Sequence, residues 1–237
     1  MRPRAIVSWS GGKDSALALY EAARDFEIAA LLTTITEDYD RISMHGVRRS
    51  LLEQQADALG CELETIAIPA RCVNADYEAR MRAALTKWLG QGVRHVICGD
   101  IFLEDIRRYR EENLFRIGLQ GVFPLWKIDS LELARRFMKL GFRAILCCVD
   151  THALDGAMAG RFYDERLLQE LPPGVDPCGE NGEFHTFVFD GPNFSHPVGV
   201  IAGERVVRDE RFCFCDLLPA AAAAGSAGSR AAILPLE

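Results

Sequence analysis

Short apolar segments and amphipathic segments alternate along residues 5–149 of the chain. The apolar segments predict buried strands at residues 5–9, 28–35, 63–68, 93–98, 122–125 and 144–149. Between them, apolar residues recur every three or four positions and predict helices at residues 14–24, 47–59, 77–88, 104–116 and 131–138. Because strands that alternate with helices form right-handed βαβ units, the pattern predicts an α/β fold with a doubly wound, mainly parallel sheet.

The alternation weakens beyond residue 149. The remaining pattern predicts a helix near residues 162–171 and strand-like segments at residues 183–190 and 198–215. We expect these pieces to form a smaller C-terminal α+β region that completes a cleft beside the parallel sheet.

This change of pattern suggests two domains, one over residues 1–125 and one over residues 126–216. Residues 217–237 are rich in Ala, Gly and Ser. Because such a composition buries little surface, we expect these last residues to form a disordered tail.

The overall composition narrows the choice of function classes. With 237 residues, of which 49% are hydrophobic, the chain can bury a sizeable core. No apolar stretch reaches the roughly 18 residues that cross a bilayer, and the apolar run after Met1–Arg4 is too short for a signal peptide. We therefore expect a cytoplasmic protein without a membrane partner. The formal net charge of −7 and the isoelectric point near 5.4 argue against a nucleic-acid-binding surface.

The eight cysteines do not follow a metal-binding pattern. None forms a C-x-x-C pair; Cys147 and Cys148 are adjacent, and Cys213 and Cys215 are two positions apart. A structural zinc site usually needs paired C-x₂₋₄-C elements, so we expect none. Most of these cysteines lie in apolar runs and are expected to act as small core residues.

The hexapeptide of residues 10–15 lies between the first predicted strand and the first predicted helix. Adjacent glycines let the backbone approach an anion, and the N–H groups at a helix start attract negative charge. Asp14 follows Gly12-Lys13 where a Walker A loop has Ser or Thr, so this is a different loop, in which the carboxylate either holds Mg²⁺ or caps the helix. The segment predicts a phosphate-binding loop made of Ser10, Gly11, Gly12, Lys13, Asp14 and Ser15.

A second polar segment, residues 177–186, gathers two carboxylates, an imidazole, a thiol and a hydroxyl around two glycines. Surface loops have similar compositions, but Glu180 and Glu183 can bind a cation or an amine, and His185 can move a proton near neutral pH. If residues 183–190 are extended, Glu183 and His185 lie on the same face and point into the same cleft.

Together these motifs resemble the diphthine–ammonia ligase family of the PP-loop ATPase superfamily, whose loop signature is S-G-G-x-D-S. The resemblance runs from Arg4 to Cys215. Besides the two motifs, it is carried by His45–Val47, Gly99–Ile101, Glu104, Arg107 and Pro124–Trp126. Many diphthine ligases have glycine and glutamate where this chain has Asn181 and His185, so the second motif resembles a bacterial branch of unassigned substrate.

The resemblance implies an AMP-forming ligase that consumes ATP. A carboxylate would attack the α-phosphate, pyrophosphate would leave into the glycine loop, and ammonia or an amine would displace AMP. Residues 1–125 would bind ATP, and residues 126–216 would bind the substrate. The expected partners are a carboxylate-bearing small molecule or protein side chain, and ammonia or an amine. The sequence does not decide whether the chain forms a homodimer.

The resemblance also implies roles for individual residues. A strand order of 3-2-1-4-5 would place Gly99 and Asp100, which follow the fourth strand, beside the phosphate loop. Gly99 would then join the nucleotide site, and Asp14 and Asp100 would hold Mg²⁺. Asp100 can instead orient the reacting group. By the same resemblance, the amidation step would use Glu180, Glu183 and Glu104.

Some residues and functions stay open at this point. His45 either neighbours a helix start or contacts the ligand, and among the arginines of the charged helix we favour Arg107 as a partner for phosphate. Two other functions compete with the ligase. One is a non-catalytic adenine-nucleotide sensor, and the other is a PP-loop tRNA-modifying enzyme that would use Cys178.

Overall fold

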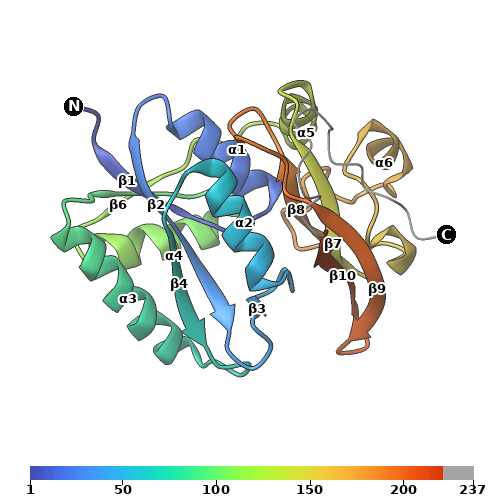
Figure 1. The fold of residues 1–237 in the computed structure, drawn as a ribbon, viewed down its shortest axis with the longest axis horizontal. Helices are drawn as coiled ribbons and strands as arrows, with labels where there is room; N and C mark the ends of the chain where they lie inside the picture. The colour runs from blue at the N-terminus through green and yellow to red at the C-terminus, as the bar shows by residue number, and fades with distance from the viewer. Residues whose placement is uncertain (221–237) are drawn as a thin grey trace.

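The computed structural model describes residues 1–220. A parallel sheet forms the centre of the N-terminal part of the molecule (Figure 1). Its parallel strands are, in spatial order, β4 (Leu63–Ile68), β2 (Glu27–Thr36), β1 (Arg4–Ser8), β5 (His95–Ile97) and β6 (Gln120–Val122). Counted along the chain, this order is 3-2-1-4-5. The predicted α/β class and the implied strand order are both confirmed.

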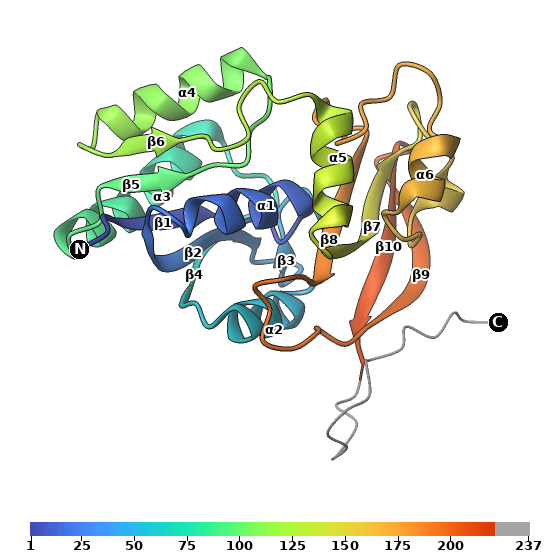
Figure 2. The same ribbon diagram turned by 90° about the horizontal axis from the view of Figure 1, so that it is seen from above.

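Helices cover both faces of this sheet (Figure 2). Ala5 and Val7 of β1 face a core that includes residues of α1 (Lys13–Ala22) and α2 (Arg49–Leu59). Ile6, between them, faces a second core with α3 (Asn74–Gly90) and α4 (Glu104–Phe115). Successive residues of a strand point to opposite faces, so a continuous apolar strand is buried on both sides.

A two-residue strand, β3 (Arg41–Ile42), was not predicted, because two residues carry no periodicity. It pairs with Ile35 and Thr36 of β2. Since β4 occupies one edge of β2 along residues 31–36 and β1 pairs with the other edge only as far as Leu32, β3 continues that second edge past the end of β1. The segment that follows β3 therefore lies beside the glycine loop.

The fifth parallel strand was predicted two residues too late. β6 ends at Val122, whereas the prediction covered residues 122–125. Pro124 has no N–H group to donate to a neighbouring strand, so pairing stops before it.

The C-terminal part contains a separate antiparallel sheet of order β8-β7-β10-β9. Short helical segments accompany it. The elements are α5 (Ser130–Lys139), β7 (Arg143–Asp150), η1 (Gly156–Met158), α6 (Glu165–Glu170), β8 (Phe184–Asp190), β9 (Val200–Arg208) and β10 (Phe212–Pro219). Figure 1 shows this sheet at the side of the parallel sheet.

The last strand also bears on the expected tail. β10 continues to Pro219, so residues 217–219 belong to a strand rather than to the tail that we expected from residue 217. Residues 221–237 lie outside the described residues. Within residues 1–220, no helix combines the length and the apolar character needed to cross a membrane.

The two sheets meet where β8 passes the glycine loop. The Val188 N–H donates to the Gly11 carbonyl at 2.9 Å, and the Lys13 N–H donates to the Thr186 hydroxyl oxygen at 3.0 Å. The start of β8 is thereby fixed to the start of α1, and residues from both parts of the chain face one cavity.

Candidate functional site

The glycine loop turns its backbone toward the cavity between the two sheets. Gly11 has a φ of +75°, a conformation that glycine adopts without strain. The Ser10 hydroxyl oxygen accepts from the Gly12 N–H at 3.2 Å and lies 3.1 Å from the Ser15 hydroxyl. Ser15 in turn donates to the Gly12 carbonyl at 2.9 Å. The loop is thus braced by its own hydroxyls. In the first turn of α1 the Lys13 N–H donates to Thr186, whereas the N–H groups of Asp14 and Ser15 have no acceptor in a preceding turn, as an anion site requires.

Gln55, which we did not predict as a site residue, holds the loop from behind. It is fully buried on α2, and its amide donates to the carbonyls of Gly11 and Val188 at 3.0 and 2.5 Å. Its oxygen accepts from the Trp9 indole at 3.1 Å. In the sequence, this glutamine looks like an ordinary polar residue of a helix. It binds the Gly11 carbonyl only because β8 packs beneath the loop.

Lys13 points toward the C-terminal part of the chain and is only 3% exposed. Its ammonium group donates to both oxygens of Asp14, at 2.8 and 2.7 Å, and to the Cys178 carbonyl. It also lies 5.7 Å from the ring centroids of Tyr163 and Phe184. Burial lowers the pKa of Lys13, but Asp14, Cys178 and Glu180 together outweigh the effect of burial, and the pKa is raised above the ordinary value.

This arrangement gives Lys13 and Asp14 a shared position at one wall of the cavity. Both residues line it. The charge of Lys13 is compensated by Asp14, so the cation acts between the two sheets rather than as an isolated phosphate ligand.

Gly99 and Asp100 lie against the glycine loop, at the end of β5. A Cβ atom on Gly99 would come within 2.8 Å of the Asp14 carbonyl carbon, so only glycine permits this approach. The Asp100 carboxylate accepts from Arg110 Nε at 3.0 Å through Oδ1, whereas its buried Oδ2 has no hydrogen-bond partner among the described residues. Arg110 lines the cavity.

Arg107, the arginine that we favoured, is turned elsewhere. Its guanidinium lies 4.7 and 4.6 Å from the ring centroids of Phe123 and Trp126, and its Nε donates to Glu111. Neither Arg107 nor Trp126 lines the cavity. The two arginines are three positions apart on α4, and the sequence alone did not tell which one faces the sheet.

The donor set at this wall suits a magnesium ion that is bound together with phosphates. Magnesium is commonly held by one or two carboxylates plus phosphate oxygens. Asp100 offers the unpartnered Oδ2, and Asp14 lines the same cavity with both oxygens accepting from Lys13, so Asp14 would join the ion through an oxygen that Lys13 releases. In residues 1–220 no group of three or more His, Cys, Asp or Glu side chains is disposed to hold a metal ion on its own.

Glu180 connects the second polar segment to the end of β5. Its Oε1 accepts from the Ile101 N–H at 2.8 Å and from the Phe102 N–H at 3.4 Å. Burial raises the pKa of Glu180 to about 7, assisted by the nearby carboxylates of Asp14 and Asp100, while the two backbone donors act in the opposite direction. A carboxyl group that titrates near neutral pH and lines the cavity can exchange a proton with a reacting group.

Glu183 does not line the cavity, although we expected it to point there with His185. It is 8% exposed, and its Oε1 accepts from the Asp176 N–H at 3.0 Å and from the Asn181 side chain at 2.9 Å. The strand β8 begins one residue later, so Glu183 does not share the alternation of the strand. Together with Asp176, which accepts from the N–H groups of Cys178 and Glu180, it shapes the loop.

His185 and His45 form a stacked pair in the cavity. Their ring centroids are 4.5 Å apart, and His45 Nδ1 lies 3.3 Å from the Thr186 carbonyl. Burial lowers the pKa of His185 to about 4 and holds that of His45 well below its ordinary value. The pair is therefore neutral at pH 7. His45 also lies close to the loop, because a Cβ on Gly12 would come within 3.0 Å of its ring.

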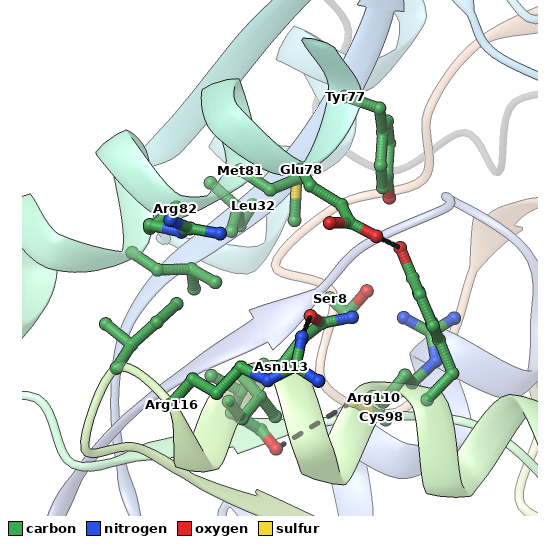
Figure 3. A pocket seen from close by; sticks show the side chains of 15 residues that line it. Ser8, Leu32, Tyr77, Glu78, Met81, Arg82, Cys98, Arg110, Asn113 and Arg116 are labelled. Carbon is green, nitrogen blue, oxygen red and sulfur yellow. Dashed lines mark hydrogen bonds between the residues drawn. The ribbon is translucent and has the colours of Figure 1, made fainter. Parts of the chain in front are cut away.

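The cavity has a volume of about 350 Å³, within the usual range for small-ligand sites. Next to the loop, its wall includes Thr33 and Thr34 at the end of β2, and the buried Thr33 hydroxyl has no partner among the described residues. A smaller, mostly apolar pocket of about 80 Å³ adjoins it between α3 and α4 and shares Tyr77, Met81 and Arg110 with it (Figure 3).

Two further candidate residues offer no reactive side chain, because Glu104 lies outside the cavity and Cys178 lines it as a buried thiol. The side chain of Glu104 is 70% exposed and accepts from Lys127 at 2.8 Å; it does not line the cavity. Cys178 is buried, its thiol donates to the Ser130 carbonyl, and burial raises its pKa to about 12. Because the thiolate is the nucleophile, this cysteine does not fit sulfur transfer.

Comparison with protein families gives two matches that together cover most of the chain. The model of the diphthamide synthase N-terminal domain matches residues 3–121, and that of the diphthamide synthase C-terminal domain matches residues 129–218. Similar curated proteins include the diphthine–ammonia ligase of Rattus norvegicus, which is 28% identical over 231 residues, covering 87% of this chain and 85% of that protein. The diphthine–ammonia ligase of Homo sapiens is 27% identical with the same coverage.

Solved structures give weaker similarities. The predicted subunit of tRNA methyltransferase from Methanocaldococcus jannaschii is 19% identical, has a TM-score of 0.44, and is matched over 80% of this chain and 98% of its own. A 4-thiouridine synthetase in complex with RNA and ATP is 18% identical, with a TM-score of 0.41 over 59% of this chain and 41% of its own.

Proposed function

Because the chain belongs to the diphthamide synthase family, as the resemblance of its motifs indicated, we propose that it is an ATP-dependent, AMP-forming amide ligase. The observation that carries this proposal is the meeting of two unlike surfaces in one cavity. One is the glycine loop of residues 10–15, which offers backbone donors. The other is Glu180, a carboxyl group whose pKa is raised to about 7.

In the first step, a carboxylate oxygen of the acceptor forms a bond to the α-phosphorus of ATP while the bond from that phosphorus to pyrophosphate breaks. The N–H groups of Asp14 and Ser15 and the hydroxyls of Ser10 and Ser15 receive the departing pyrophosphate. Asp100, through its unpartnered Oδ2, and Asp14 would hold Mg²⁺, which when bound offsets the charge on the phosphates. Arg110 keeps the Asp100 carboxylate in place.

The base end of the nucleotide would lie beside the loop. The small apolar pocket offers Met81 and Leu32, and Thr33 offers a hydroxyl without a partner of its own. These groups can take a flat ring with polar edges, while the triphosphate extends along the glycine loop.

In the second step, ammonia or an amine forms a bond to the carbonyl carbon of the acyl adenylate, and the bond from that carbon to AMP breaks. The attacking nitrogen must lose a proton. Glu180 can accept it, since its pKa near 7 leaves a substantial ionised fraction at neutral pH. His185 and His45 stay neutral and shape the wall beside the reacting carbonyl.

The test measures the fate of ATP. Purified protein, MgATP and ammonium are incubated with the small-molecule fraction and, separately, the desalted protein fraction of a cell extract. We expect AMP and pyrophosphate in equal amounts, dependent on one of the fractions. Formation of ADP and phosphate, or binding of MgATP with no turnover in either fraction, would contradict a ligase, and the latter would favour a nucleotide sensor.

A further inference from the structure

A second cavity opens from the first on the far side of His185. It has a volume of about 430 Å³ and lies between the end of the parallel sheet and one face of the antiparallel sheet. The two cavities share Ile42, Met44 and His185 in their walls. A molecule in the second cavity would therefore reach the nucleotide cavity past the imidazole that stacks on His45.

The strand register defines the floor of this cavity. Across the antiparallel sheet, His185 is opposite Cys148, Cys148 is opposite Phe214, and Phe214 is opposite Val206. The row thus crosses from β8 to β9 over three strand spacings, or about 14 Å. One row further on, Phe212 is opposite Arg208.

The opposing wall comes from the segment around β3. Tyr39 and Met44 are large apolar side chains that are 54% and 71% exposed, respectively, and both line the cavity. With Phe212, Phe214 and Val206 below them, they give the middle of the cavity an apolar character.

The charges are unevenly compensated. Asp216 pairs with both Arg41 and Arg48, at 2.9 and 2.7 Å. Arg208 lies 5.2 Å from the Tyr39 ring centroid and 5.9 Å from that of Phe214, but makes no ion pair with any carboxylate among residues 1–220. Asp209, the next residue along the chain, also lines the cavity and forms no ion pair with it.

We infer that this second cavity is the acceptor pocket and that it takes an elongated small-molecule acid. The reacting carboxylate lies at His185 beside the glycine loop, an apolar chain crosses the sheet, and a second anionic group meets Arg208. The inference rests on the proposed function and adds to it the class of the acceptor. Its reaction is the one given above: the carboxylate displaces pyrophosphate from ATP, and nitrogen then displaces AMP.

Two adjacent valines provide a matched pair of variants. Val206 lines the cavity, whereas Val207 points away from it and is 57% exposed. Val206→Trp places an indole in the cavity at the β9 end of this row, beside Arg208, and Val207→Trp places the same group on the opposite face. The measured quantity is acid-dependent exchange of labelled pyrophosphate into ATP, with the small-molecule extract fraction and with a series of dicarboxylic acids as probes.

For wild-type protein, exchange should be highest with dicarboxylic acids whose carboxyl groups can lie about 10–14 Å apart, the span of the sheet row. Val206→Trp should lower exchange at least tenfold while MgATP binding and the melting temperature stay unchanged. Val207→Trp should behave as wild type. Arg208→Ala should raise the KM for the dicarboxylic acids about tenfold without affecting the matching monocarboxylic acids, and Arg208→Lys should recover part of the loss.

Equal exchange in the two tryptophan variants would overturn the pocket, as would an effect of Arg208→Ala on monocarboxylic and dicarboxylic acids alike. Exchange that needs the protein fraction and persists in Val206→Trp would overturn a small-molecule acceptor. These failures leave adenylation intact. Absence of exchange with every probe and fraction, despite MgATP binding, would instead contradict the proposed function itself.

Discussion

The two loops that form the nucleotide cavity differ in how far their own sequence fixes the groups that face the ligand. In residues 10–15 the hydroxyls bind their neighbours, since Ser10 binds Gly12 and Ser15, and Ser15 binds Gly12, although the distant Gln55 also binds the Gly11 carbonyl. In residues 176–186 Asp176 makes local bonds, but the carboxyl group that lines the cavity, Glu180, accepts from the distant Ile101 and Phe102.

The difference matches the chemistry that each loop supplies. A phosphate cradle needs backbone N–H groups in a fixed local conformation, which a short sequence can specify. A proton-transferring carboxyl group needs a shifted pKa, which depends on burial by other parts of the chain. The conformation of the first loop is therefore specified largely by its own sequence, whereas the pKa of Glu180 is shifted only when both parts of the chain are assembled.

The largest effect is expected from cutting the link between the loops. Lys13→Met leaves the Asp14 carboxylate and the Cys178 carbonyl without their buried donor, which should lower the free energy of unfolding by about 3 kcal/mol. Urea unfolding measures this. Lys127→Met, which removes an exposed lysine paired with Glu104, is the control and should leave the unfolding midpoint unchanged. Similar midpoints for the two variants would show that the loops are not joined through Lys13.

The second prediction concerns the carboxyl group that depends on assembly. Glu180→Gln removes the proton acceptor and should slow amide formation about 100-fold at pH 8, while MgATP binding persists. The wild-type kcat/KM, expressed per concentration of unprotonated amine, should rise with pH and level off above about 7, because only the ionised carboxylate accepts a proton. The variant should lose this rise.

The same shift has a consequence for stability. The pKa of Glu180 is raised from 4.5 to about 7 in the folded state, so protonation stabilises the fold below pH 4.5, and this contribution is lost as the pH rises through 7. Glu180→Gln should therefore gain stability relative to wild type above pH 7. If kcat/KM of the wild type showed no inflection near pH 7, or if Glu180→Gln kept the wild-type pH dependence of kcat/KM, Glu180 would not take part in proton transfer.

The third prediction tests how closely β5 must approach the glycine loop. In Gly99→Ala, the new methyl group would come within 2.8 Å of the Asp14 backbone, which should cost about 1–3 kcal/mol of stability and weaken MgATP binding. Gly90→Ala is the control, because its Cβ meets nothing within 4 Å. Calorimetric titration and thermal unfolding of both variants measure the two effects. Normal MgATP affinity in Gly99→Ala would show that the close approach is not needed.

The contrast between the loops also explains what could be predicted from the sequence. The alternation of strands and helices and the glycine loop depend on local patterns, whereas the strand order was implied by the family resemblance; Ser10, Gly12 and Ser15 lie in the cavity as expected. The sequence also predicted that residues 177–186 form a second functional loop. It did not tell which carboxylate faces the cavity, since Glu180 and Glu183 differ only by the contacts that distant residues make with them.

Other residues were missed for the same reason. In the sequence, Gln55 is indistinguishable from other polar residues of a helix, and the two carbonyls to which it donates come from segments 44 and 133 residues away. Arg110 and Arg107 share one charged helix, and the packing of that helix on the sheet decides between them. Such choices depend on tertiary contacts that no local pattern encodes.

A fourth, smaller effect separates the two glutamates of the second loop. In Glu183→Gln, the side-chain oxygen can still accept from Asp176 and Asn181, so the loop should keep its shape. We expect amide formation within about threefold of wild type, the equivalent of less than one hydrogen bond. A loss as large as that of Glu180→Gln would place Glu183 in the reaction.

The smallest effect is expected at Glu104, which the family resemblance had suggested for the amidation step. Its carboxylate accepts from Lys127 at the surface, and this bond lowers the pKa of Glu104. Because ion pairs between exposed side chains contribute little, Glu104→Gln should leave both AMP formation and the melting temperature at wild-type values. Steady-state rates at several amine concentrations measure this. A selective rise in the KM for the amine would mean that Glu104 reaches the cavity during turnover, and that the second loop recruits a carboxylate from α4 as well as its own.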